Sequence, residues 1–99
     1  MLFTQNEAVI YNLMVDDMLI GGLVDVDELS EKTGLAVNSI KGVLGSLSKK
    51  RLIECEEGDN IRADAIWPIH RKNGEIGFWA DMMSREEVLS SKILEEEIK

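Results

Sequence analysis

One pattern recurs in this chain and limits what it can fold into: a helix-capping side chain followed three positions later by glutamate. In such a capping box the first side chain accepts a hydrogen bond from an amide of the first helical turn. The glutamate in turn accepts one from the amide of the capping residue. The pattern occurs at Thr4/Glu7, Asp25/Glu28 and Ser84/Glu87. We therefore expect helices to begin directly after Thr4, Asp25 and Ser84.

The first predicted helix is apolar on more than one side. Asp16 and Asp17 mark an exposed side, and Gly21-Gly22 is expected to end the helix. Its apolar residues are Val9, Ile10, Leu13, Met14, Met18 and Leu19. This distribution is compatible with contacts on two sides, one with the core and the other with a partner molecule.

A second and a third helix are predicted on either side of Gly34. Glycine adopts the left-handed conformation that often follows a helix at little cost, so Gly34 should end the second helix. The third helix should end near Lys50. Its apolar residues follow the helical spacing i, i+3, i+4, i+7, at Ile40, Val43, Leu44 and Leu47. Its cap position is Ala36, and Gly42 and Gly45 stand inside it, each costing about 1 kcal/mol relative to alanine.

Alternating apolar residues predict a pair of strands after the third helix. Leu52, Ile53 and Cys55 alternate with glutamates through Glu57, and residues 58–60 read Gly-Asp-Asn, a turn signal. The return strand has Ile61, Ala63, Ala65 and Trp67 on one face. Its register stays open because Ile66 lies on the opposite face.

A second hairpin and a last helix are predicted after Pro68, which interrupts the return strand. Asn73-Gly74 is a strong two-residue turn signal because both residues tolerate positive φ. This turn pairs Lys72 with Glu75, Arg71 with Ile76 and Ile69 with Phe78. The helix that starts after Ser84 has an apolar side made of Val88, Leu89 and Ile93, and Ile98 as well if it continues to the end of the sequence.

This order of elements predicts an α+β fold, mainly α, in a single domain, since 99 residues leave no room for a second core. A single cysteine, Cys55, excludes an internal disulfide and a multi-cysteine zinc site. Cys55 is expected in the core. The single histidine, His70, excludes a His-rich metal site and is expected on a strand surface. No cofactor is implied.

Location follows from two further features. The apolar runs are far shorter than the roughly 18–20 residues that span a bilayer. Residues 1–31 contain no Lys or Arg, unlike the basic start of a signal peptide. We expect a cytoplasmic protein.

The net charge of −8 argues against nucleic acid as a partner, but its distribution does not. Residues 1–31 carry seven acidic and no basic side chains. Residues 32–53 carry no acid and five bases, which are Lys32, Lys41, Lys49, Lys50 and Arg51. A basic block in an acidic chain creates a local positive potential that can steer an anionic partner. The same bases could equally balance neighbouring acidic faces.

Two short helices joined by a glycine-containing turn and followed by a hairpin are arranged as in a winged helix-turn-helix. The segment DELSEKTGLAVNSIKGVLGSLSKKRLI resembles the winged-helix region of MarR-like bacterial transcriptional regulators, over about residues 7–67. We place the helix-turn-helix at about 25–50, the wing at about 52–67, and an extra C-terminal hairpin and helix at about 68–98. The resemblance implies a small transcriptional regulator that binds duplex DNA as a dimer. We do not expect an enzyme, because no catalytic constellation appears in the sequence.

The resemblance places the third helix in the major groove and the wing over the adjacent minor groove. Asparagine can bond an adenine edge, serine a phosphate or a base edge, and lysine or arginine a phosphate. The implied DNA-binding residues are Asn38, Ser39, Lys41, Ser46, Lys49, Lys50, Arg51 and Arg62. Gly42 also faces the groove but offers no side chain. Asn38 and Ser39 could instead serve only as polar groups of the first helical turn.

The wing departs from the family pattern. Its tip, residues 56–59, reads Glu-Glu-Gly-Asp and would repel phosphate, and Arg62 is the only base nearby. The alternative is therefore an acidic winged-helix module that binds a protein partner, for which the small residues of the third helix leave room.

Two expectations concern surfaces outside the third helix. One recognition helix covers only a few base pairs, so we expect a homodimer formed through the terminal helices. Arg71 and Lys72 lie beside the Asn73-Gly74 turn, where they could contact phosphate or an acidic partner. Alternatively, the hairpin only packs Ile69 and Phe78 onto the core, and its tip is exposed to solvent without binding anything.

Overall fold

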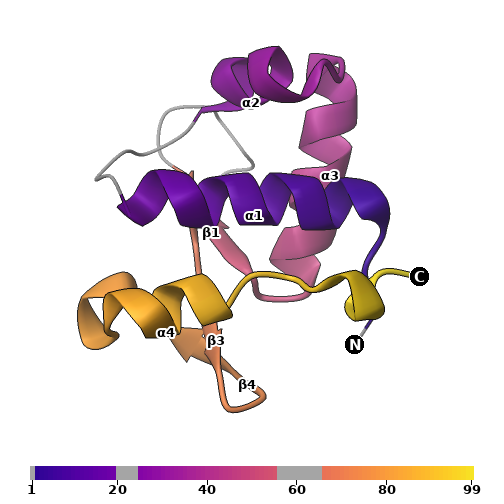
Figure 1. Ribbon diagram of the computed structural model, residues 1–99. Helices are drawn as coiled ribbons and strands as arrows, with labels where there is room; N and C mark the ends of the chain where they lie inside the picture. Colours follow the sequence, from indigo (N-terminus) through magenta and orange to yellow (C-terminus); the bar gives the residue numbers. More distant parts are fainter. Residues whose placement is uncertain (1, 20–24, 56–65) are drawn as a thin grey trace.

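The computed structural model describes residues 2–19, 25–55 and 66–99, and it has an α+β fold that is mainly α (Figure 1). Three helices come first, followed by two antiparallel strand pairs and a short C-terminal helix. The helices are α1 (Gln5–Leu19), α2 (Val26–Thr33), α3 (Val37–Lys49) and α4 (Arg85–Ser90). The strands are β1 (Ile53–Cys55), β2 (Ile66–Pro68), β3 (His70–Lys72) and β4 (Glu75–Phe78), and the 3-10 turns are η2 (Ala80–Met82) and η3 (Glu95–Glu97). The predicted fold class is confirmed.

All three predicted helix starts are confirmed by their hydrogen bonds. The Glu7 amide donates to Thr4 Oγ1 at 3.1 Å, and the Thr4 amide donates to Glu7 Oε1 at 2.8 Å. The Glu28 amide donates to Asp25 Oδ1 at 2.7 Å. Ser84 and Glu87 form the same reciprocal pair at the start of α4. Each bond satisfies an amide that the first helical turn leaves without a partner.

The turn between α2 and α3 depends on Gly34, as predicted. Its φ of 76° is left-handed, and its amide donates to Ser30 O at 2.9 Å, closing α2. The Ser30 hydroxyl then donates to Leu35 O at 2.6 Å. Ala36 makes no side-chain cap hydrogen bond at the start of α3.

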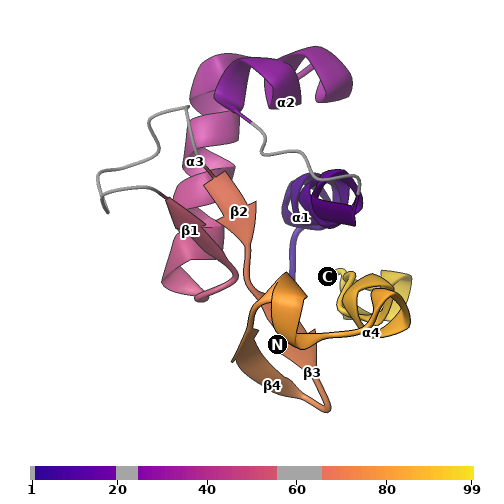
Figure 2. The ribbon, with the colours of Figure 1, turned by 90° about the vertical axis from the view of Figure 1, so that its left-hand side faces the viewer.

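Helix α1 lies in the middle of the domain. Figures 1 and 2 show it between the α2–α3 pair and α4, and it also contacts β2. Its buried core side chains, at most 2% exposed, are Ala8, Ile10, Tyr11, Met14 and Val15, and Glu7 is 2% exposed as well. Of the apolar residues that we took as compatible with a partner, contacts within the chain account for Ile10 and Met14. Val9 is 36% exposed, and the side chains of Met18 and Leu19 lie outside the described part. Gly21-Gly22 lies outside the described residues.

The first strand pair resolves the register that the sequence left open. Ile53 faces Pro68, Glu54 faces Trp67 and Cys55 faces Ile66. Ile66 points into the core and Trp67 away from it, where its ring lies 6.4 Å from that of Trp79. The expected turn at 58–60, the return strand from Ile61 to Ala65 and the side chain of Cys55 lie outside the described part.

The second hairpin has the predicted turn but one different pair. Asn73 and Gly74 have φ of 54° and 82°, and Lys72 faces Glu75 and Arg71 faces Ile76. Phe78 pairs with His70 rather than with Ile69, because a bulge lies between His70 and Arg71. Ile69 is used elsewhere, since its amide donates to Leu52 O at 2.8 Å.

The expectation that His70 lies on a strand surface is wrong. Its side chain is fully buried, and Nδ1 lies 2.8 Å from the hydroxyl of Ser91, which is also fully buried. That hydroxyl donates to Val88 O at 2.6 Å, so we infer that His70 Nδ1 carries a proton and donates to it. Nε2 has no hydrogen-bond partner among the described residues.

The expectation that Ile93, and Ile98 with it, lies on the last helix is wrong, because α4 ends at Ser90. The backbone of Ile93 is bonded instead by the side chain of Asn12 from α1. The Ile93 amide donates to Asn12 Oδ1 at 2.8 Å, and Asn12 Nδ2 donates to Ile93 O at 3.0 Å. Beyond this point Ile98 forms a parallel bridge with Phe3, which brings the two ends of the chain together (Figure 1).

Candidate nucleic-acid interface

Helix α3 has one fully buried side and one exposed side without acidic groups. Ile40, Leu44 and Leu47 are 0% exposed and hold the helix against the core. We call the exposed side the α3 surface, and its members are Asn38, Ser39, Lys41, Gly42, Ser48 and Lys49. Because α3 contains no Asp or Glu, this surface carries positive charge in a chain whose net charge is −8.

Gly42 and Gly45 are not required for packing inside the domain. A Cβ atom added to either residue would meet no atom within 4 Å. Both glycines destabilise the helix relative to alanine. They leave the backbone of α3 open to close approach by another molecule.

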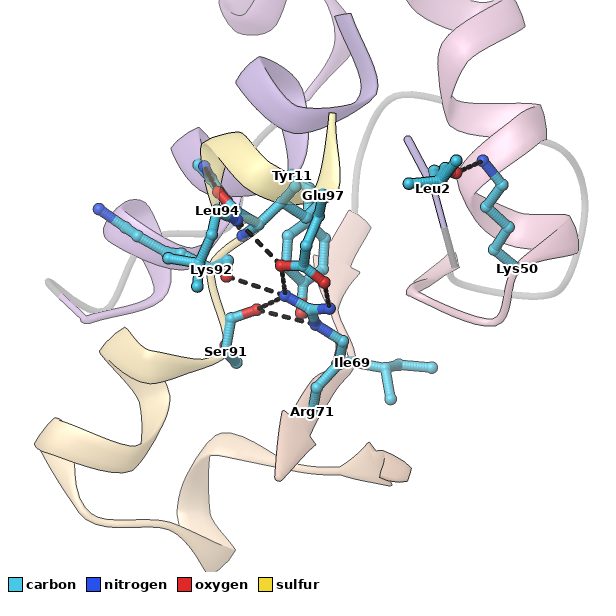
Figure 3. A network of polar contacts seen from close by, with 11 residues as sticks. Leu2, Tyr11, Lys50, Ile69, Arg71, Ser91, Lys92, Leu94 and Glu97 are labelled. Carbon is cyan, nitrogen blue, oxygen red and sulfur yellow. Dashed lines mark hydrogen bonds and ion pairs between the residues drawn. The ribbon is translucent and has the colours of Figure 1, made fainter. Parts of the chain in front are cut away.

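Two of the predicted DNA-binding residues instead point into the domain, toward Glu7 of α1. Lys50 Nζ lies 2.8 Å from both carboxylate oxygens of Glu7, and the Ser46 hydroxyl donates to Glu7 Oε2. Lys50 Nζ also lies 5.0 Å from the centre of the Phe3 ring and donates to Leu2 O at 3.3 Å (Figure 3). These contacts tie α3 to α1, which gives Ser46 and Lys50 a structural role.

Glu7 is 2% exposed and is ionised at neutral pH. Burial raises the pKa of its carboxyl group, but hydrogen bonds from Lys50, Ser46 and the Thr4 amide outweigh burial and bring the pKa below its ordinary value. The sequence identified Glu7 only as a capping residue. Its partners lie far away along the chain, and no local pattern indicates them.

Lys32 is also paired within the domain. Its Nζ lies 3.2 Å from Asp17 Oδ1 and 3.1 Å from Glu28 Oε2. Hydrogen bonds to these two carboxylates raise the pKa of Lys32 above its ordinary value.

Four bases of the block at residues 32–53 are exposed: Lys32, which is paired as described above, and Lys41, Lys49 and Arg51. The last three remain as candidates for binding another molecule. Within residues 2–19, 25–55 and 66–99, no ion pair involves any of them. Arg51 is the second residue after α3 and has a left-handed φ of 64°. Arg62 and the acidic wing tip lie outside the described residues.

The two bases of the second hairpin, which we predicted as a contact for phosphate or an acidic partner, are both paired with carboxylates of the chain. The Arg71 guanidinium contacts both Glu97 oxygens, at 2.6 and 3.0 Å, and donates to Ser91 O and Lys92 O (Figure 3). Lys72 Nζ lies 2.7 Å from Glu87 Oε2. Hydrogen bonds from Arg71 lower the pKa of Glu97, so this ion pair is present at neutral pH.

A depression of about 680 Å³ lies between this hairpin and the C-terminal segment. Its cations, Arg71, Lys72 and Lys92, are each paired with a carboxylate of the chain. The described ranges contain no group of three or more His, Cys, Asp or Glu side chains that could hold a metal ion. The depression therefore offers no unpaired cation to an anionic ligand, and the α3 surface is the better candidate.

In the part of the chain that the structure describes, no helix is long and apolar enough to cross a membrane. No protein-family model, no curated protein and no solved structure matches the chain.

Proposed function

We propose that the chain is a winged helix-turn-helix regulator that binds duplex DNA through the α3 surface. The observation that carries this proposal is the exposure of Lys41 and Lys49 on a helix without acidic residues. Two features support it: the order of three helices followed by an antiparallel strand pair, and the Gly34 turn that joins α2 to α3.

Four members of the α3 surface have roles that their chemistry permits. Lys41 and Lys49 pair with backbone phosphates, which positions the protein on the duplex. Asn38, in the first turn of α3, bonds a base edge, and adenine suits its amide. Ser39 bonds a phosphate or a base edge next to it. Ser46 and Lys50 are left out because both contact Glu7.

Binding to a random-sequence duplex, titrated with salt, tests this proposal. Each phosphate contact releases counterions, so the logarithm of affinity falls by about 0.9 per contact for each unit of log salt. Lys41→Ala and Lys49→Ala should each weaken binding and reduce the slope. Arg85→Ala removes an exposed base from α4 and should change neither quantity.

A protein partner is the second candidate, and the open backbone at Gly42 and Gly45 favours it. An acidic module of this kind would bind no duplex, since its carboxylates repel phosphate. Absence of binding across a random-sequence library at about 50 mM salt would contradict the DNA proposal and favour this one.

Assembly as a homodimer through the terminal segments is part of the DNA proposal. On α1 Val9 is 36% exposed, and near the C-terminus Leu89 and Leu94 are 38% and 54% exposed. Light scattering at tens of micromolar protein should give twice the chain mass. A monomer mass that does not rise with concentration would contradict the dimer.

A further inference from the structure

The end of α3 closes with a backbone motif that requires a left-handed residue. The Leu52 amide donates to Leu47 O at 3.0 Å, and the Arg51 amide donates to Ser48 O at 3.0 Å. These two bonds form only when the residue between the helix and Leu52 has positive φ. Arg51 occupies this position, with φ of 64°.

Glycine is the residue that meets this requirement with least strain, and the chain uses it elsewhere. At the end of α2 the left-handed residue is Gly34, with φ of 76°. At the turn of the second hairpin the left-handed residues are Gly74 and Asn73, and asparagine is a residue type that tolerates this conformation. Arginine has no such tolerance, because its Cβ crowds the following carbonyl oxygen.

Packing does not account for the arginine. Its side chain is exposed, and it makes no hydrogen bond or ion pair with the residues that the structure describes. Its neighbours on both sides are held firmly, Lys50 by Glu7 and Leu52 by the core, where it is 0% exposed. The guanidinium is therefore presented from a fixed point beside Lys49.

We propose that Arg51 is a dedicated phosphate contact, and that the use of its side chain accounts for a non-glycine residue in the left-handed position. A guanidinium can bind two phosphate oxygens at once through a rigid fork, which the ammonium group of lysine cannot do. Arg51 would then hold the duplex backbone at the C-terminal end of the α3 surface. This inference rests on the proposed function.

The test is Arg51→Gly, measured for both stability and duplex binding. Glycine relieves the strained backbone and removes the guanidinium, so the melting temperature should rise while affinity falls severalfold. The salt slope should fall by about 0.9 for each Arg51 contact. Arg51→Lys keeps the charge and the strain, and should give intermediate affinity with the slope retained.

Two matched variants separate this contact from general effects. Asn73→Gly relieves the other left-handed residue that is not glycine, and it should leave the affinity for duplex unchanged. Arg85→Ala removes one positive charge from α4, and it should also leave the affinity unchanged. Equal weakening by either control would overturn the inference. If wild-type protein binds duplex and Arg51→Gly binds equally well with the same salt slope, the inference is overturned and the proposed function is not. Wild-type protein that binds no duplex overturns the proposed function, and the inference with it.

Discussion

Lys50 at the end of α3 and Glu7 at the start of α1 form an ion pair in which Nζ lies 2.8 Å from both carboxylate oxygens. Glu7 is almost fully buried, and it also caps α1 through Thr4. One carboxylate therefore holds the helix of the proposed DNA surface in its place on the core.

Removal of Lys50 should destabilise the fold without touching the DNA surface. Lys50→Ala leaves a buried carboxylate without its cation, a change that costs about 3 kcal/mol. Urea denaturation measures this loss. The salt slope of duplex binding should stay at the wild-type value, and a reduced slope would instead assign Lys50 to a phosphate.

The same ion pair predicts acid sensitivity. The pKa of Glu7 in the folded state lies below its ordinary value of 4.5, so the stabilisation is fully present above pH 4.5. It is lost as pH falls through the folded pKa. Glu7→Gln should be less stable than wild type at neutral pH, and the gap should narrow on acidification. A constant gap from neutral to acidic pH would contradict this assignment.

His70 predicts a second pH dependence, at higher pH. Burial lowers its pKa below the ordinary value of 6.5, so the unfolded chain binds a proton more readily than the folded one. Stability is then fully present above pH 6.5 and falls as pH drops below it. Urea midpoints at about pH 7.5 and about pH 5.5 should differ for wild type but much less for His70→Gln. If the urea midpoint changes by the same amount between the two pH values in both proteins, a group other than His70 titrates.

The glycines of α3 predict stabilising substitutions. Gly42→Ala and Gly45→Ala meet open space, so each should raise the free energy of unfolding by about 1 kcal/mol. Gly34→Ala is the matched control, because its left-handed φ should make the same change destabilising. Loss of stability in Gly42→Ala or Gly45→Ala would mean that a neighbour occupies this space.

The two bases of the second hairpin should behave differently. Arg71 is 18% exposed and binds Glu97 and two carbonyl groups, so Arg71→Ala should cost about 2 kcal/mol and increase hydrogen exchange in the C-terminal segment. The Lys72–Glu87 pair is more exposed, and Lys72→Ala should cost less than about 1 kcal/mol. Similar losses for both would contradict the structural role of Arg71.

The sequence by itself determined the features that depend on neighbours within a few positions. The capping boxes, the Gly34 turn and the Asn73-Gly74 hairpin follow from the hydrogen-bonding and φ preferences of adjacent residues. The helical spacing of α3 also identified its buried side, Ile40, Leu44 and Leu47. Together these local signals established the α+β class and the order of the elements.

Only the tertiary structure decided which polar residues point inward. Lys50 and Glu7 are 43 positions apart, and Arg71 and Glu97 are 26 apart. His70 is buried because α4 brings Ser91 over β3, a contact that its strand position does not reveal. A lysine or arginine that stays in solvent and one that pairs with a carboxylate across the core look alike in sequence. The reason is that the carboxylate that compensates for the burial of the charge lies far away along the chain. The presence of such a carboxylate determines which bases of the block are left without a partner.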